Sequence, residues 1–290
     1  MSAAGRPRDA VLLVVAVLCV SASAPLIAAC TAPALAIAMY RCALGAAVTA
    51  AAMVVMGRPI RVTGGWSRAA LPGVALAAHF AAWIPSLRLT TVALSTAMIS
   101  TQPVWSALLS RVTGRLVWMG IGVSLVGVLI LTGFGDPLDA RNLLGMALAL
   151  LGAVLAAVYV AYGERLRATT DVGSYTSVVY GAAAAALLLV CLVVRVPLTG
   201  YSARDWGLIL AITLVAQIGG HSAMNAVVHR VSATVVSTAI LFEAPGATIL
   251  AAIFLGQPVG VALIGGLVVM LVGLVLVVRG SRPRTAESGV

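Results

Sequence analysis

The sequence predicts an all-α integral membrane protein with ten transmembrane helices, arranged as two inverted five-helix repeats. Three observations support this fold class: extreme hydrophobicity, ten evenly spaced apolar segments, and an internal repeat. Of the 290 residues, 62% are hydrophobic and 9% are charged, and the mean hydropathy is +1.12. Soluble domains are about half apolar and about a quarter charged, so a single soluble core is excluded.

Ten apolar segments are each long enough to cross a bilayer, which requires about 20 residues. They cover residues 10–28, 34–56, 69–87, 92–110, 116–134, 142–163, 173–194, 206–227, 233–255 and 259–278. The longest connections, 57–68 and 195–205, are about a dozen residues long. These connections leave no room for an ATPase or another soluble module.

The basic residues indicate how the segments are oriented. All 18 are arginine, and without lysine the chain has neither a Walker-type phosphate loop nor a Schiff-base nucleophile. With the N-terminus inside, 13 arginines fall on the cytoplasmic side, Arg41 lies within a span, and four, namely Arg88, Arg141, Arg195 and Arg204, fall outside. Cytoplasmic connections carry the excess of basic residues, so both termini are predicted to be cytoplasmic. The net charge of +10 is therefore assigned to membrane orientation and not to nucleic-acid binding.

The first segment has an alternative interpretation. Arg6, Arg8, an apolar run and the small residues 21–24 resemble a cleavable signal peptide. The apolar run continues through residues 25–30, and the repeat described next requires a first span. We therefore expect the segment to remain in the protein as a transmembrane helix.

An internal repeat relates the two halves of the chain. Residues 78–103 align without gaps with residues 220–245. The alignment pairs His79 with His221, Arg88 with Arg230, Ser95-Thr96-Ala97 with Ser237-Thr238-Ala239, and Pro103 with Pro245; after a four-residue slip, Gly120 and Gly127 pair with Gly266 and Gly273. Several polar residues, prolines and glycines match in the same order in both halves, which indicates a duplication.

The number of spans in each repeat determines how the halves are related. The predicted halves, residues 1–136 and 137–290, contain five spans each. An odd number of spans places the second copy upside down in the bilayer. Inverted repeats that meet near the bilayer midplane are the architecture of many alternating-access carriers. Channels with inverted repeats also exist, so the type of transport stays open at this point.

These features together resemble the EamA family of the drug/metabolite transporter superfamily, over nearly the whole chain. The resemblance rests on the five-plus-five spans, on Ala38-Met39-Tyr40-Arg41 in the second span, on the Ser-Thr-Ala and proline pattern of spans four and nine, and on glycine-rich spans five and ten. The family's usual Gly-Glu after spans four and nine is here Gly114-Arg115 and Gly256-Gln257. The resemblance implies an exporter of amino acids or other small metabolites in the bacterial inner membrane.

Two ionisable residues are predicted at membrane depth, Arg41 in span two and Glu243 in span nine. A charge at the bilayer centre costs about 2.5–3.5 kcal/mol on insertion scales, so each needs a partner or a watery cavity. Their aligned positions, Gly181 and Thr101, are uncharged. Two interpretations stay open. Either Arg41 holds a substrate carboxylate while Glu243 faces an amine or carries a coupling proton, or the two form a structural ion pair.

Other polar residues are predicted to line the pathway. His79 and Trp83 are four residues apart, as are His221 and Asn225, so each pair shares a helix face. The alternative for a membrane histidine is a helix–helix hydrogen bond. The predicted pathway also includes the mid-span residues Tyr40, Tyr180 and Gln102, with Gln217 as a further neutral polar group.

The sequence lacks the motifs that are typical of enzymes. There is no HExxH motif and no cluster of metal ligands, so we expect no catalytic residue, metal or cofactor. Asp136 and Asp139 form a lone pair of acids in an outer connection, interpreted as a solvated turn. The expected partners are a small-molecule substrate and the lipid bilayer, with proton coupling and a homodimer as further hypotheses. A passive channel or facilitator is the alternative function, followed by a membrane-embedded lipid-modifying enzyme.

Overall fold

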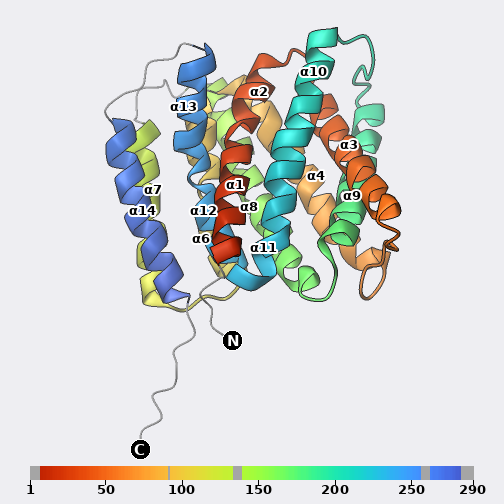
Figure 1. Ribbon diagram of the computed structural model, residues 1–290. Helices are drawn as coiled ribbons and strands as arrows, with labels where there is room; N and C mark the ends of the chain where they lie inside the picture. Colours follow the sequence, from red (N-terminus) through yellow and green to blue (C-terminus); the bar gives the residue numbers. More distant parts are fainter. Residues whose placement is uncertain (1–6, 91, 133–138, 256–261, 282–290) are drawn as a thin grey trace, which may run out of the picture.

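The computed structural model describes residues 7–90, 92–132, 139–255 and 262–281, which form helices joined by short connections and contain no strand (Figure 1). Six long spans are α1 and α2 (Pro7–Ser21 and Ser23–Ala29), α3 (Ala34–Val55), α4 (Trp66–Leu89), α8 (Ala140–Arg167), α9 (Val172–Val193), and the run of α10, η1 and α11 (Ala203–Ala211, Ile212–Ser222 and Ala223–Val231). The remaining four are α5 and α6 (Val92–Ile99 and Gln102–Leu109), α7 (Arg115–Thr132), α12 and α13 (Ala233–Ile240 and Glu243–Leu255), and α14 (Ala262–Gly280). The predicted all-α membrane architecture of ten spans is confirmed.

Polar side chains fix where several of these helices begin. The Asp139 carboxylate accepts a hydrogen bond from the Asn142 backbone N–H at 2.7 Å, and Asp171 accepts one from Ser174 at 2.9 Å. Such caps satisfy backbone donors that have no partner inside the helix. Asp139, predicted as part of a solvated turn, is thus a helix cap. The described residues do not include Asp136, Gly256, Gln257, Arg282 or Arg284. The predicted boundary between residues 136 and 137 also lies outside them.

Spans four and nine are both interrupted near the middle. The helix breaks between α5 and α6 at residues 100–101, and between α12 and α13 at residues 241–242. A proline follows each break, Pro103 and Pro245, and proline removes a backbone donor and clashes with the preceding turn. Glu243 is therefore the first residue of a half-helix inside the bundle.

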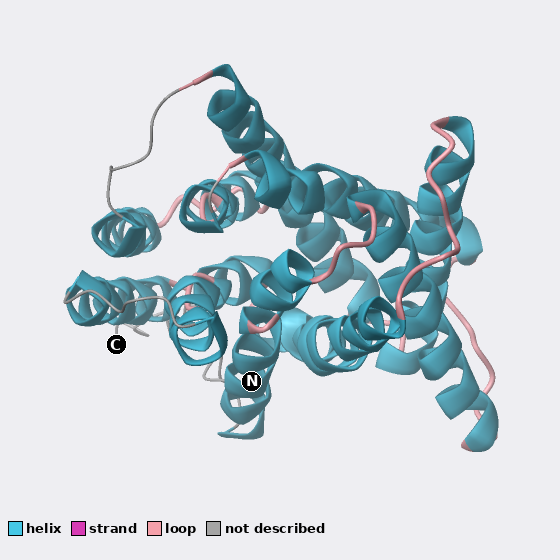
Figure 2. Ribbon diagram, turned by 90° about the horizontal axis from the view of Figure 1, so that it is seen from above, coloured by secondary structure: helices cyan, strands magenta, loops and turns pink. Residues whose placement is uncertain are grey.

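The helices pack in pairs that are equivalent in the two halves of the chain. α7 packs against α14, α3 against α9, and α6 against α12. In the same way α4 packs against α8, and the equivalent η1 and α11 pack against α1. Exchanging the first five spans with the last five leaves this pattern unchanged. Figures 1 and 2 show α7 and α14 side by side at one edge of the bundle.

Glycines bring α7 and α14 into direct backbone contact. A Cβ added at Gly120 would lie 2.6 Å from the Gly273 carbonyl oxygen, and one added at Gly127 would lie 2.8 Å from the Gly266 carbonyl oxygen. Real Cβ atoms essentially never come this close to another heavy atom. The four glycines that the repeat aligns therefore contact one another across this interface.

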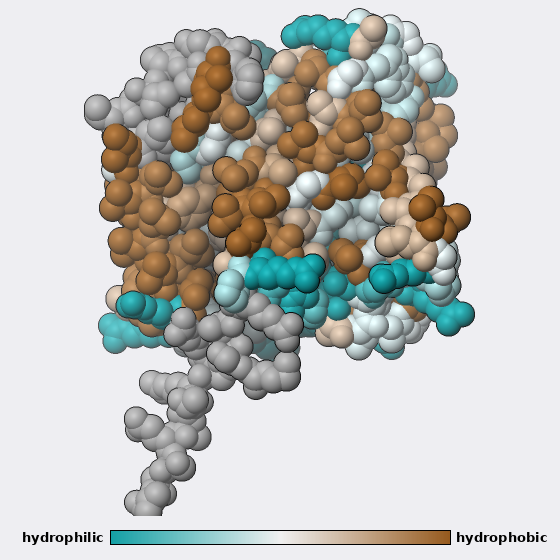
Figure 3. Space-filling model, in the orientation of Figure 1, coloured by the Kyte–Doolittle hydropathy of each residue, from teal (hydrophilic) through white to brown (hydrophobic). Residues whose placement is uncertain are grey.

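The outer surface of the bundle is apolar. Large hydrophobic side chains are exposed on many helices, including Val55 at 87% and Ile264 at 70%. Figure 3 shows this hydrophobic surface above a band of hydrophilic residues, at the face where α1 begins and α14 ends. Exposed apolar area on this scale is expected where lipid surrounds a protein.

Candidate functional site

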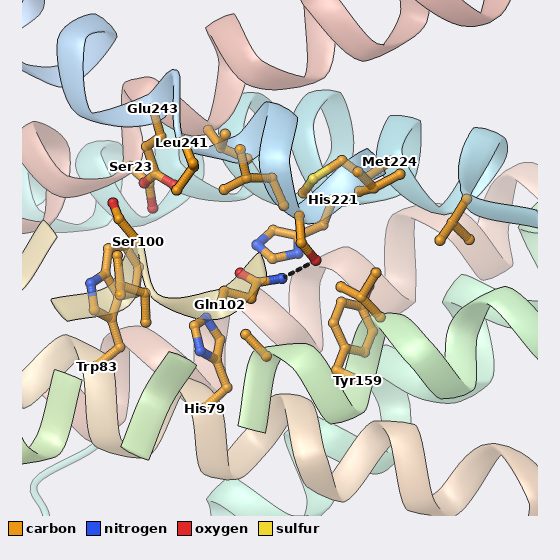
Figure 4. A pocket seen from close by; sticks show the side chains of 18 of the residues that line it. Ser23, His79, Trp83, Ser100, Gln102, Tyr159, His221, Met224, Leu241 and Glu243 are labelled. Carbon is orange, nitrogen blue, oxygen red and sulfur yellow. Dashed lines mark hydrogen bonds between the residues drawn. The ribbon is translucent and has the colours of Figure 1, made fainter. Parts of the chain in front are cut away.

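A cavity lies inside the bundle, walled by side chains from α1–α2, α4, α5–α6, α8, η1–α11 and α12–α13 (Figure 4). Its free volume is about 50 Å³, enough for a few water molecules. Six of the nine predicted pathway residues line it: His79, Trp83, Gln102, His221, Asn225 and Glu243. The cavity therefore combines residues of both halves of the chain.

His79 and Trp83 form one wall of the cavity from α4. Their rings are stacked, with centroids 5.8 Å apart and planes inclined by 9°. His79 Nδ1 is 2.9 Å from the Gly152 carbonyl oxygen, which can only accept, so Nδ1 donates the hydrogen bond. The indole N–H of Trp83 is buried and has no hydrogen-bond partner among the described residues. This donor is available to a molecule in the cavity.

His221 and Asn225 occupy the equivalent positions on the opposite side. His221 is near the end of η1, a π-helix, and packs its ring edge-on against Phe80 at 5.4 Å between centroids. Its Nδ1 is buried and unpartnered within the described part of the chain. The Asn225 side-chain amide donates to the Tyr159 hydroxyl at 2.6 Å and to the Tyr180 hydroxyl at 3.5 Å. π-Helical turns are frequently found at functional sites.

Gln102 links the two interrupted spans. Its side-chain amide donates to the Ser237 hydroxyl at 3.1 Å, and the Ser106 and Ser237 hydroxyls are 2.7 Å apart. Ser237 belongs to the second Ser-Thr-Ala motif, and Ser95 of the first motif is hydrogen-bonded to Ser86 at 2.7 Å. The repeated motif thus holds spans together beside the cavity.

Arg41 lies behind the cavity wall and is 1% exposed. Its Nε donates to the Gln217 side-chain oxygen at 2.9 Å and its Nη1 to the Ser23 hydroxyl at 3.2 Å. The guanidinium also lies 4.1 Å above the centre of the Phe80 ring, a cation–π contact. Since Ser23 lines the cavity, the arginine is one hydrogen bond away from it.

Glu243 lines the cavity and forms no ion pair with Arg41. Among the described residues the nitrogen–oxygen distances within 4.0 Å join Arg230 to Asp9 and do not include this pair. Nor does the Glu243 carboxylate have a hydrogen-bond partner in the described ranges. The two groups still interact electrostatically. Arg41 is therefore hydrogen-bonded to Gln217 and Ser23 and does not form the hypothetical structural ion pair with Glu243.

The two predicted tyrosines have different positions. Tyr180 is buried behind the cavity, and its hydroxyl is 3.1 Å from the Ser222 hydroxyl. Tyr40 lies away from the cavity: its hydroxyl donates to the Leu198 carbonyl at 2.6 Å, and its ring packs against Trp206 at 4.8 Å. α3 begins only six residues before Tyr40, which places this side chain near the end of the span.

Several residues at the cavity were not anticipated, above all Tyr159 and Ser23. Tyr159 is in the middle of α8, far from the interfacial zone where tyrosine is usual in membrane helices. That mid-span position was the available signal. Ser23 is a small residue within an apolar run, and its position gave no signal of a role at the cavity.

A double-mutant cycle distinguishes coupling of Arg41 to Gln217 from coupling of Arg41 to Glu243. Arg41→Met leaves the Gln217 oxygen without its donor, which costs about 1–3 kcal/mol, whereas replacing both partners by apolar groups is nearly neutral. In unfolding measurements on Arg41→Met, Gln217→Leu and the double variant, we expect a coupling free energy of about 1–3 kcal/mol. The same cycle with Glu243→Gln should give a smaller value. A larger coupling to Glu243 would restore the ion-pair hypothesis.

Comparisons with known proteins agree with this architecture. One solved crystal structure superimposes with a TM-score of 0.77 over 94% of this chain and 96% of its own, at 17% sequence identity, which is a likeness of fold. No curated protein sequence matches the chain. The sequence model of the EamA-like transporter family matches residues 143–279, which cover most of the second half. This match supports membership of the EamA-like transporter family, and with it a membrane transporter of the drug/metabolite type.

Proposed function

We propose that the protein is a secondary transporter that exports a small polar metabolite, an amino acid or a related zwitterion, across the bacterial inner membrane by alternating access. The observation that carries the proposal is the cavity between the two halves, which presents polar groups that have no hydrogen-bond partner within the described ranges. These groups are the Trp83 indole N–H, His221 Nδ1 and the Glu243 carboxylate.

The unpartnered groups match the ends of a zwitterion. A buried polar atom without a hydrogen bond costs about 1–3 kcal/mol, and a bound substrate would relieve that cost. The Glu243 carboxylate is suited to a substrate amine or to a coupling proton. The Trp83 N–H is a donor suited to a substrate carboxylate. Arg41, held away from the cavity, is hydrogen-bonded to Ser23 in the cavity wall.

The packing supports a rocking motion between two parts of the bundle. Contacts between helices keep the same pattern when the two sets of five spans are exchanged, as expected for inverted repeats. The free volume of about 50 Å³ is too small for an amino acid, so the surrounding helices would have to separate when substrate enters. The arginine count favours a cytoplasmic location for the face where α1 begins, which tags at the two ends of the chain would test.

Counterflow in proteoliposomes tests the proposal against a passive channel. The purified protein is reconstituted, loaded with unlabelled amino acid, and diluted into labelled amino acid at a low concentration. A carrier that exchanges substrate accumulates label transiently above its external concentration, and an open pore only equilibrates it. We expect transient accumulation for at least one amino acid in a panel. Simple equilibration throughout the panel would favour a channel.

A further inference from the structure

A second pocket, of about 320 Å³, lies at the face of the bundle where α1 begins. It is formed by α1, the end of α8, the beginning of α9 and the end of α11. Its lining includes Arg8, Asp9, Leu12, Arg167 and Arg230, and it shares no residue with the central cavity. The three arginines come from three different helices and converge on one space.

The positive charge of this pocket exceeds its negative charge. Asp9, which is 3% exposed, accepts hydrogen bonds from Arg230 Nε at 2.9 Å and from Arg230 Nη2 at 2.6 Å. The nearby Asp171 is engaged in capping α9 through the Ser174 N–H. Both carboxylates therefore already have partners, while two further guanidinium groups remain.

Arg167 and Arg8 supply the free donors. Arg167 is 7% exposed, and its Nε donates to the Asn225 carbonyl oxygen at 2.8 Å. Its terminal nitrogens have no hydrogen-bond partner in the described part of the chain, and Arg8, which is exposed, has neither a hydrogen bond nor an ion pair there. A largely buried guanidinium with unused donors is an arrangement that favours a phosphate oxygen.

The surface beside the pocket is suited to a hydrocarbon chain. Along α1, Val11, Val15 and Leu18 follow Arg8 at spacings of three and four residues and so continue the same helix face. These side chains are 61%, 42% and 64% exposed. Figure 3 shows hydrophilic residues along this face of the molecule directly below the hydrophobic surface, which is the level of lipid headgroups.

We propose that this pocket binds the phosphate of an anionic phospholipid, with an acyl chain lying along α1. Arg8 and Arg167 hold the phosphate oxygens, and Arg230 contributes positive charge while it remains paired with Asp9. Basic pockets between transmembrane helices are a known type of site for acidic headgroups. The bound lipid would link α1 of the first half to α8 and α11 of the second.

Native mass spectrometry of the detergent-purified protein tests the proposal, with phosphatidylglycerol as the probe. Arg8→Gln and Arg167→Gln should each weaken the apparent Kd by about five- to tenfold, as expected for the loss of one guanidinium contact. Arg165→Gln is the matched control, because Arg165 is an exposed arginine of the same helix end that does not line the pocket. Its affinity should equal that of the wild type.

Competition by inorganic phosphate distinguishes a lipid from a free anion. If millimolar phosphate leaves lipid binding intact, the headgroup and chain together are the ligand, as proposed. If phosphate alone binds and displaces the lipid in an Arg8-dependent and Arg167-dependent manner, the pocket is a phosphate site for a soluble ligand and the lipid assignment is overturned. Equal lipid affinity in Arg8→Gln, Arg167→Gln and Arg165→Gln would overturn the site itself. Arg8 is exposed, so its variant remains informative even where Arg167→Gln does not fold.

Discussion

Glu243→Gln is expected to abolish gradient-driven efflux while the protein folds as well as the wild type. The substitution keeps the shape of the side chain and removes its charge and its proton. Glu243 lines the cavity and has no ion-pair partner among the residues described, so no structural contact is lost. Charge-assisted hydrogen bonds contribute about 1.5–3 kcal/mol, so transport should fall by about ten- to a hundredfold or more. Efflux from proteoliposomes under a proton gradient measures the effect.

The pattern of loss identifies the role of the carboxylate. If Glu243 carries a coupling proton, the variant loses proton-driven efflux but retains substrate exchange. If it binds the substrate amine, both activities disappear. Glu164→Gln is the matched control, because Glu164 lies near the end of α8 outside the cavity and its side-chain oxygen can still accept from Ala233 N–H. Unchanged efflux in folded Glu243→Gln protein would rule out both roles.

Gly120→Ala should have the largest effect on stability. The added methyl group would lie 2.6 Å from the Gly273 carbonyl oxygen and 2.7 Å from the Val277 backbone nitrogen. Backbone atoms cannot move aside as side chains do, so α7 and α14 would be forced apart. Overpacking of this kind costs about 1–3 kcal/mol and sometimes more, and we expect a lower midpoint of thermal unfolding in detergent.

Gly122→Ala provides the control on the same helix. No atom of the described residues lies within 4 Å of a Cβ added at Gly122, so this variant keeps the interface and gains helix propensity of about 0.8–1.0 kcal/mol. Opposite shifts of the two midpoints would show that the close approach of α7 and α14 stabilises the fold. Equal midpoints would show that the contact contributes nothing in solution.

The ten spans and the faces of individual helices could be predicted because they follow from local rules. Hydropathy locates a span, and spacing places His79 with Trp83 and His221 with Asn225 on one face each, beside the cavity. The glycines that pack α7 against α14 were marked by the repeat, although the repeat did not name the partner helix. Each of these inferences uses residues within one helix or a pattern that is duplicated.

Contacts between spans could not be predicted in this way. Arg41 and Glu243 were the two ionisable residues placed at membrane depth, yet Arg41 is bound to a neutral amide, because tertiary packing brings Gln217 and not Glu243 against it. The π-helical turns of η1 could not be predicted from the sequence either, since analysis of helical periodicity assumes 3.6 residues per turn. Within η1, Gln217 and His221 are four residues apart, yet Gln217 reaches Arg41 and His221 lines the cavity.

The continuous helical run from Ala203 to Val231 has a mechanical consequence. Although it belongs to the second half of the sequence, it is tied to the first half at three levels. Asp205 accepts from Thr31 N–H at 2.7 Å near one end, Gln217 holds Arg41 in the middle, and Arg230 binds Asp9 near the other end. Because these contacts occur near both ends and in the middle of the helical run, we expect the run to move together with the first half. In a rocking motion, the hinge line would therefore pass between this run and the rest of its own half, and the moving bodies would not coincide with the two repeats.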